Sequence, residues 1–501
     1  MRRHYWSQGM GPKRENNRNF RRKNSQRRFN DRYGLGASSE TAETSKDVRP
    51  YSSAPQASSV PELPGFYFDP EKNRYFRLLP GHNNCNPLTK EGIQQNEMEM
   101  KRQRLLEEEK TRKKSSRHGL NASMLVWKRQ LGLMHFTTYC RRVHELKVNL
   151  MQKKEVYIHS PEPVGAGTHR FEFILADSEC KTLFAVNDVE NGFCKYGLLS
   201  LNGLWKDLPT VESHDNPYFT NQKVVAACWA SLTAPDSHVL VCLLGKSEIP
   251  GCVSLIPACL FKNLNTDTDD NHPEMLYNVR VSNAWSCAWN LNPRLECSYS
   301  AGLSNQILVM NAVTDVRKTF RTNSDVLAQQ FATESLLLYN GLRSGEIFAI
   351  DMRVPSLSPT NWRKALSISH GSSITCLQLL QDENYMVVAD MCGRIKLWDV
   401  RMVKCVQFYE GHNNSYAYLP VHVKEDEGLL LAVGQDCYTR VWNLHDARLL
   451  RTIPSPYPAA KDSIPSVVFS PHLGGKGHMV PGLLMAVKKD LYHFTYDSDA
   501  L

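Results

Sequence analysis

The sequence predicts an all-β fold, a seven-bladed WD-repeat β-propeller, preceded by an N-terminal helical segment and a disordered basic tail. The first observation is the stretch 387–401, VVADMCGRIKLWDVR, in which apolar and polar residues alternate on either side of a turn signal. Such alternation is typical of two short antiparallel strands of a half-buried sheet. The second observation is that its Trp-Asp ending recurs in degenerate form at a period typical of four-stranded propeller blades. The positions equivalent to Trp398 are Met310, Ile350, Trp442 and, approximately, Phe494.

The number of blades follows from the spacing of these positions. The spacings are 40, 48, 44 and about 52 residues, and the longest contains a Gly/His/Pro insertion at 472–482. Two weaker units fit 170–201 and 224–260, and a third begins at Trp285. The sequence therefore predicts seven blades over 161–501, or 341/7 ≈ 49 residues per blade.

The basic charge is confined to the N-terminus. Residues 1–32 hold eleven Lys/Arg against two acidic residues and so supply the whole net charge of +9, because the remainder balances 49 basic against 49 acidic residues. Residues 1–58 contain too few aliphatic side chains to offset chain entropy, and we expect them to be disordered. Three interpretations compete: a solvating tail, a nuclear import signal and, least favoured, a weak RNA contact through phosphates. The import residues would be Arg21, Arg22, Lys23, Arg27 and Arg28.

Residues 59–160 are expected to form an aromatic segment followed by a helical arm. At 61–80 aromatic residues and arginines interleave, which fits a hairpin or an extended segment that packs on a larger domain or, as the alternative, stacks bases. From 123 to 150, apolar residues approximate a 3.6-residue stripe, with Gly132 as a break between two helices. Such a pair needs a partner surface, either the propeller flank or another protein. The candidate contact residues are Trp127, Leu131 and Met134.

Several classes of protein are not favoured by the sequence. The longest unbroken apolar run, 239–244, is far shorter than the roughly 20 residues of a membrane span, and no apolar stretch follows the N-terminus. We therefore expect an intracellular protein, in the nucleus and/or the cytoplasm, with no membrane partner. The fourteen cysteines are scattered without CxxC spacing, which indicates reduced thiols. No phosphate loop, HExxH, nucleophile elbow or kinase motif occurs, so we expect no enzyme activity, no cofactor and no metal.

One blade carries the internal signature of its repeat class. His412 precedes the first strand, Asp436 lies in the tight turn and Trp442 follows six residues later. We expect these three residues to tie the strands together through hydrogen bonds, a structural role only. The blade that ends at Trp398 departs from the signature, because Cys392 occupies the turn position.

An acid followed by an arginine recurs at the end of two adjacent blades. Asp399-Val400-Arg401 has a partial twin in Asp351-Met352-Arg353, whereas the next blade has Asn443 and His445 at these positions. An arginine two residues beyond a third strand is expected to project from the corner into solvent or a partner, and arginine is favoured for bidentate contacts at protein interfaces. Two such arginines would form one patch.

These motifs resemble those of a known family. VVADMCGRIKLWDVR matches the DWD box and GEIFAIDMR is a degenerate copy, and stretches such as ELPGFYFDPEKNRYFRLLPGHNNCNPLTK extend the likeness over residues 59–501. The chain resembles the DCAF family of WD-repeat substrate receptors for cullin-4 RING ubiquitin ligases. The resemblance implies docking on the adaptor, damage-specific DNA-binding protein 1, through a helix-loop-helix before the propeller and through the DWD-box blades. The implied adaptor contacts are Asp351, Arg353, Trp398, Asp399 and Arg401, together with the helical stripe.

The resemblance further implies a non-catalytic receptor that reaches cullin-4 and its RING subunit through the adaptor and presents a protein substrate. Nothing in the sequence names that substrate. The alternative is a WD-repeat scaffold or an RNA-associated propeller that uses the basic tail.

Overall fold

The structure is a computed structural model that divides into two compact units, 1–78 and 79–501. The predicted tail, 1–58, lies outside the described residues, as do the five candidate import residues within it. The described residues are 66–69, 74–77, 90–111, 122–159, 170–189, 192–214, 217–246, 249–261, 277–354, 362–474 and 481–495.

The first unit contains a short antiparallel hairpin. Its strands are β1 (Phe66–Asp69) and β2 (Arg74–Arg77), and Tyr67 pairs with Phe76. Of the two conformations predicted for 61–80, the hairpin is confirmed.

Three helices precede the sheets of the second unit. The predicted break between two helices is confirmed at Gly132, which has φ +70°. Its N–H bonds to the Arg129 carbonyl at 3.1 Å, and the Leu133 N–H bonds to the Lys128 carbonyl at 2.9 Å. This pair of bonds is the Schellman ending that a glycine in the left-handed region allows. The helices are α1 (Lys90–Thr111), α2 (Ala122–Gln130) and α3 (Phe136–Leu150).

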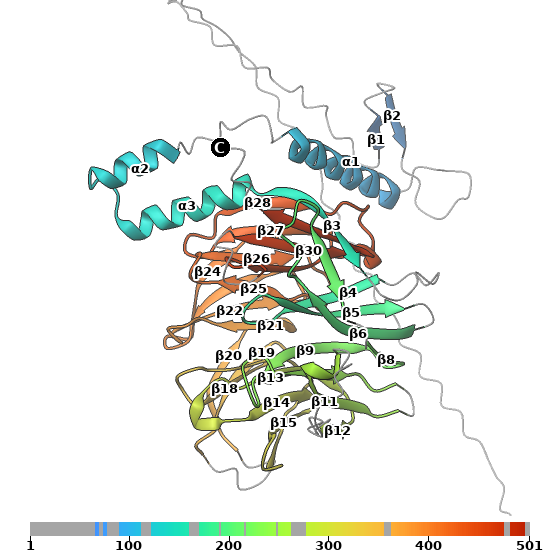
Figure 1. Ribbon diagram of the computed structural model, residues 1–501, viewed down its shortest axis with the longest axis vertical. Helices are drawn as coiled ribbons and strands as arrows, with labels where there is room; N and C mark the ends of the chain where they lie inside the picture. The colour runs from blue at the N-terminus through green and yellow to red at the C-terminus, as the bar shows by residue number, and fades with distance from the viewer. Residues whose placement is uncertain are drawn as a thin grey trace, which may run out of the picture. The chain divides into compact units, whose positions relative to one another are not determined.

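The described chain after α3 is built mainly from strands, which pair into sheets (Figure 1). Five sheets have four strands each: β9 (Val224–Ala230), β10 (His238–Leu243), β11 (Gly251–Pro257) and β12 (Tyr277–Val281); β13 (Ala284–Trp289), β14 (Ser298–Leu303), β15 (Gln306–Asn311) and β16 (Arg317–Arg321); β17 (Val326–Phe331), β18 (Leu337–Leu342), β19 (Glu346–Asp351) and β20 (Lys364–Ser369); β21 (Ile374–Leu379), β22 (Tyr385–Asp390), β23 (Ile395–Asp399) and β24 (Lys404–Tyr409); β25 (Val421–Lys424), β26 (Leu429–Val433), β27 (Tyr438–Asn443) and β28 (Leu449–Pro454). The sixth sheet of the described residues has nine strands: β29 (Ser466–Ser470), β30 (Gly482–Val487), β31 (Asp490–Thr495), β3 (Gln152–His159), β7 (Thr210–Ser213), β6 (Phe193–Ser200), β5 (Thr182–Val189) and β4 (Arg170–Ala176), with β8 (Tyr218–Thr220) beside β6.

The nine-stranded sheet joins the two ends of the propeller. β3 pairs antiparallel with β31, with Lys153 opposite Phe494, and its far end pairs parallel with β7, with Tyr157 opposite Thr210. A strand from before residue 161 is thus part of the propeller, whereas the sequence assigned it to the helical arm. The prediction of seven blades requires that this sheet be divided between β3 and β7, so that β29, β30, β31 and β3 form one blade and the remaining strands form another. The number of blades stays a prediction.

The innermost strands line one central cavity of about 990 Å³. Its walls include β4, β9, β13, β17, β21, β25 and β29, the first strand of each successive group. The third strands of the sheets carry the predicted repeat. Each of the five predicted equivalent positions is the second-last residue of its strand, so this register of the repeat is confirmed: Met310 in β15, Ile350 in β19, Trp398 in β23, Trp442 in β27 and Phe494 in β31.

The strand-tying hydrogen bonds lie in a different sheet from the predicted one. Trp398 Nε1 donates to His370 Nδ1 at 3.2 Å, and His370 Nε2 lies 3.4 Å from the Asp390 carboxylate. The sheet that was predicted to be the best formed differs, because Trp442 Nε1 donates to the Glu410 carbonyl at 2.9 Å.

His412 therefore receives no bond from Trp442 and only faces its ring at 6.5 Å between centroids. Asp436 is occupied by Arg440, which approaches its two carboxylate oxygens at 3.0 and 2.5 Å. The histidine, aspartate and tryptophan of the repeat signature are all present in this sheet. The predicted hydrogen bonds do not form, because the Asp436 carboxylate pairs with Arg440 instead.

Within the described part of the chain, the cysteines are free thiols, and no three acidic, histidine or cysteine side chains gather as a metal site would require. None of the described helices combines the length and apolar character needed to cross a bilayer.

Candidate protein-docking face

Four consecutive sheets end their third strand in the same capped turn. A side-chain oxygen at the strand end accepts a hydrogen bond from the backbone N–H two residues later, which is an Asx turn. The residue two positions on is thereby directed away from the sheet. The bonds run from Val313 N to Asn311 at 3.0 Å, Arg353 N to Asp351 at 2.9 Å, Arg401 N to Asp399 at 2.9 Å and His445 N to Asn443 at 2.9 Å. We call the surface made by these turns, 312–316, 352–354, 400–403 and 444–448, the turn face.

Arg353 is held by its own turn. Its Nε donates to both Asp351 carboxylate oxygens at 2.9 and 3.1 Å, and its Nη2 donates at 2.6 Å. The guanidinium holds the pKa of the Asp351 carboxyl below its ordinary value. The Arg353 side chain is nevertheless 68% exposed. It is therefore oriented in advance and still accessible to a partner.

Arg401 has the same arrangement with an aromatic addition. Its Nη2 lies 3.3 Å from the Asp399 carboxylate, and its guanidinium lies 5.9 Å from the centroid of the Tyr385 ring. The Met402 backbone N–H, with Arg401 as a further donor, holds the pKa of the Asp399 carboxyl below its ordinary value. The Arg401 side chain is 60% exposed.

The other three predicted contact residues of these blades, Asp351, Trp398 and Asp399, are largely buried and support the turns. The Asp351 and Asp399 side chains are only 19% and 11% exposed, because each is occupied by its own turn. Trp398 is 8% exposed and packs in the apolar cluster between two sheets. It supports the turn from below, and the prediction that it contacts a partner is corrected to a supporting role.

Apolar side chains surround the two arginines. Val354 follows Arg353 and is 56% exposed, and Met402 follows Arg401 and is 73% exposed. Val403, the next residue, is 43% exposed. Arginine and methionine are enriched at protein interfaces, whereas lysine and the acidic residues are depleted there.

The turns are tied to one another across the sheets. Glu383, in the turn after β21, accepts hydrogen bonds from the backbone N–H groups of Glu334 and Ser335 in the turn after β17, at 2.6 and 3.0 Å. The Gln381 N–H donates to Glu425, in the turn after β25, at 2.7 Å. Within each sheet, the Met352 N–H donates to the Leu336 carbonyl and the Val400 N–H donates to the Asn384 carbonyl, both at 2.9 Å. The turns that carry the two arginines are therefore joined to these first-strand turns, and through them to each other.

The same row of turns holds helix α3. Asn443 Nδ2 donates to Glu145 at 2.6 Å, while Asn443 Oδ1 caps the turn. Arg142 pairs with the same Glu145 at 2.8 Å, and His144 lies 3.0 Å from Glu427. Glu145 is 3% exposed and Asn443 is fully buried. An amide can cap the turn and donate to Glu145 at the same time, whereas a carboxylate would meet Glu145 with like charge. This explains why the acid of the two other turns is absent here.

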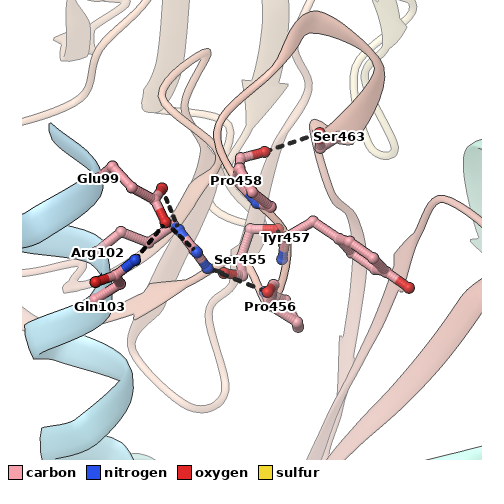
Figure 2. A network of polar contacts seen from close by, with 8 residues as sticks. All are labelled: Glu99, Arg102, Gln103, Ser455, Pro456, Tyr457, Pro458 and Ser463. Atoms are coloured by element: carbon pink, nitrogen blue, oxygen red, sulfur yellow. Dashed lines mark hydrogen bonds and ion pairs between the residues drawn. The ribbon is translucent and has the colours of Figure 1, made fainter. Parts of the chain in front are cut away.

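Helix α1 fastens the outer edge of the same sheet, and Figure 2 shows its contacts. Arg102 is oriented by Glu99 at 2.5 and 2.8 Å and donates to the carbonyls of Ser455 and Pro456 at 3.0 and 3.1 Å. Arg451, whose side chain has no exposure, links both helices. It donates to the Val148 carbonyl at 2.6 Å and pairs with Glu109 at 2.6 Å. The sequence singled out none of these residues except Asn443, which interrupts the acid-and-arginine pattern.

Helix α2 and its connection to α3 carry exposed apolar side chains. Trp127 and Leu131, both predicted contact residues, are 54% and 53% exposed, and the third, Met134, is half-buried. The neighbouring exposed apolar residues are Met124, Val126, Leu133 and Phe136. Figure 1 shows α2 linked to the sheets through α3, which runs beside β28. The structure thus brings the helical and the arginine candidates to elements that are bonded together.

The family of the chain is decided by its propeller. A family model described as the "DDB1- and CUL4-associated factor 4 beta-propeller domain" matches residues 139–496. The chain belongs to the DDB1- and CUL4-associated factor 4 family. The match begins within α3 and ends just after β31, so the family's propeller includes the strand β3 that joins the two ends.

Curated relatives agree with this family. Human DDB1- and CUL4-associated factor 4 is 57% identical over 88% of each chain, and the bovine protein of that name is 55% identical over 89% of each. A human DDB1- and CUL4-associated factor 4-like protein 2 is 51% identical over 80% of this chain and all of the relative. These names associate the relatives with DDB1 and CUL4. The matches are long enough to include the helical arm in addition to the propeller.

Proposed function

We propose that the chain is a non-catalytic substrate receptor of a cullin-4 RING E3 ubiquitin ligase. In this proposal it docks on the adaptor, damage-specific DNA-binding protein 1 (DDB1), and thereby reaches cullin-4 and its RING subunit. The names of the relatives support the partnership. The observation that carries the proposal is the pairing of an exposed apolar helix, α2, with two exposed arginines in the two sheets that precede the one holding α3.

Each part of this surface has a distinct chemical task. Trp127 on α2 and Leu131 directly after it are suited to a hydrophobic groove, because an amphipathic helix binds by laying its apolar side into such a groove. Arg353 and Arg401 are held by their aspartates, so little side-chain entropy is lost when a partner acceptor meets them. Arginines of this kind confer orientation and specificity in addition to affinity.

The proposed role requires no reaction by this chain. A bound substrate is held near the ubiquitin-charged enzyme, and the gain is in effective concentration. The transfer chemistry belongs to other subunits, and the protein substrate is unknown. The proposal includes a location in the nucleus and/or the cytoplasm, which fluorescence microscopy of the tagged chain tests.

The test is co-purification with DDB1. Wild-type chain is expected to bind DDB1 in equal stoichiometry, and Arg353→Ala/Arg401→Ala is expected to weaken binding at least fivefold if both arginines lie in the interface. Arg343→Ala is the matched control. It lies at the other end of the β17–β20 sheet from Arg353, pairs with Asp325 at 2.9 Å and stacks on Trp285 at 5.0 Å.

Circular dichroism establishes that each variant is folded. Equal loss from Arg343→Ala would contradict a specific role for the turn face. No binding of DDB1 by the wild-type chain would exclude the receptor function.

A scaffold or RNA-associated propeller is the second candidate, and the confinement of the net charge to residues 1–32 favours it. In that case RNA binding falls steeply with salt and disappears when residues 1–32 are deleted. RNA affinity that is unchanged by the deletion would exclude the tail as the contact.

A further inference from the structure

The turn after β15 has the geometry of the arginine turns without their charge. Asn311 ends the strand as Asp351 and Asp399 do, and it accepts a hydrogen bond from the N–H of Val313 at 3.0 Å. Val313 therefore occupies the position of Arg353 and Arg401. A search for the acid-and-arginine pattern does not find this turn, because only the backbone and the amide cap are shared.

This turn presents apolar surface. Val313 is 65% exposed and Val316 is 56% exposed, although valine is usually a core residue. The charged residues of the turn, Asp315 and Arg317, pair with each other at 2.9 Å. Leu291, in the first-strand turn of the same sheet, is 67% exposed. Three exposed apolar side chains, Leu291, Val313 and Val316, thus lie on the two neighbouring turns at this end of the sheet, beside the exposed Arg294 and Glu296, and we call them the apolar patch.

Hydrogen bonds link the patch to the arginine turns. Asn311 Nδ2 donates to the Glu296 carbonyl at 2.9 Å, which joins the two turns of this sheet. Asn292 Nδ2 donates to the carbonyl of Glu334 at 3.0 Å, and the Glu334 N–H donates to Glu383 in the sheet that carries Arg401. The patch is therefore continuous with the row of turns that holds the arginines.

We propose that the apolar patch of Leu291, Val313 and Val316 is a third contact of the turn face for DDB1. This inference rests on the proposed function and extends its interface by one sheet beyond the arginine pattern. The contact is apolar, so it contributes affinity through the removal of Val313 and Val316 from water. The arginines remain the oriented, polar part of the interface.

The size of a stable interface supports a single partner that spans these turns. Specific interfaces bury about 800 Å² on each partner, contributed by roughly 20–30 residues. Two arginines and the three apolar residues beside them are too few for such an area. The helix α2 and the patch on the adjoining sheet enlarge the surface at its two sides.

The experiment measures the dissociation constant for purified DDB1 by calorimetry with the full chain. Val313→Asp and Val316→Asp are each expected to weaken binding about tenfold, because a carboxylate would be buried against an apolar surface. Val406→Asp is the matched control, since Val406 is 54% exposed but lies on the outer strand β24. It is expected to bind as the wild type does.

The milder Val316→Ala is expected to weaken binding about twofold to threefold, and it retains the fold if the Asp variants do not. Wild-type affinity in the Val313 and Val316 variants, with binding lost in Arg353→Ala/Arg401→Ala, would overturn the third contact alone. Equal weakening in Val406→Asp would overturn it as well. Failure of the wild-type chain to bind DDB1 would overturn the contact together with the proposed function.

Discussion

The β25–β28 sheet and the β21–β24 sheet use the same turn for opposite purposes. In the first, Asn443 caps the turn and also holds Glu145 of α3, so the turn is covered by the chain's own helix. In the second, Asp399 caps the turn and orients Arg401, which stays exposed. A single change from amide to carboxylate separates a turn that docks an internal helix from a turn that is open to a partner.

The comparison shows that the departure from a motif can carry as much information as the motif. Asn443 and His445 interrupt the acid-and-arginine pattern because this position is already occupied within the chain. The covered sheet therefore fixes the arm, and the open sheets leave their arginines exposed.

The largest effect on DDB1 binding is expected at helix α2 and the residue that follows it. Trp127→Asp/Leu131→Asp is expected to weaken DDB1 binding by a hundredfold or more, since both side chains are large, apolar and suited to be interface anchors. The melting temperature is expected to be unchanged, because both are more than half exposed. Calorimetric titration and thermal unfolding measure the two quantities. A binding loss no larger than that of the arginine variants would place the main contact on the turns instead.

One added charge is expected to disrupt the contact between the Asn443 turn and helix α3. Asn443→Asp is expected to lower the free energy of unfolding by about 3 kcal/mol, because the new carboxylate is buried against Glu145 and loses the donated hydrogen bond. Urea unfolding measures it. Adding Glu145→Gln is expected to restore most of the loss.

The reciprocal change is the matched control. Asp399→Asn keeps the turn cap and loses only the ion pair with the exposed Arg401, so it is expected to lower the free energy of unfolding by less than Asn443→Asp does, since an amide oxygen caps equally well. If Asn443→Asp were as harmless as Asp399→Asn, the two turns would not differ in the way described.

The smallest effect on the free energy of unfolding is expected for the histidines beside Trp398 and Trp442 in the same two sheets. His370→Ala is expected to cost about 2 kcal/mol of unfolding free energy, because it leaves Trp398 Nε1 without its acceptor in a buried site. His412→Ala is expected to cost less than half as much, since Trp442 keeps its bond to the Glu410 carbonyl. Equal costs would contradict the assignment of the tie to His370.

The pH dependence of unfolding sharpens this test. Burial lowers the pKa of His370, and lowers that of His412 to about 4, both from an ordinary value of 6.5. The unfolded chain therefore binds a proton first as the pH falls, so the stability that each neutral histidine supplies is complete above pH 6.5 and is lost below it. His370→Ala is expected to flatten this loss between pH 7 and pH 5. A parallel shift of the whole curve would contradict it.

The fold was largely predictable because it is repeated locally. The alternation within 387–401 and the strand pattern around each of the four positions equivalent to Trp398 are visible in short stretches of sequence. The structure confirms the register of all five positions. Gly132 was recognisable because few residues other than glycine adopt its backbone conformation. The strand β3 was placed in the helical arm because its partner, β31, lies at the other end of the sequence, and no local signal reports such a pairing.

The candidate site was predictable only in part. The arginines follow from their position after a strand, but the burial of Trp398 depends on the packing of the adjoining sheet. Glu145 and Arg451 look like ordinary charged surface residues in the sequence, and their partners lie about 300 residues away. The Val313 turn carries no charge pattern, so three-dimensional equivalence alone reveals it.

The pairing of β3 with β31 also bears on how the protein is made. α3 runs directly into β3 through Met151, and β3 obtains its antiparallel partner only when β31 has left the ribosome. A nascent or truncated chain that ends before β31 leaves this strand edge exposed and the base of the arm without its neighbour. A firmly held arm thus requires that the chain has been made through β31.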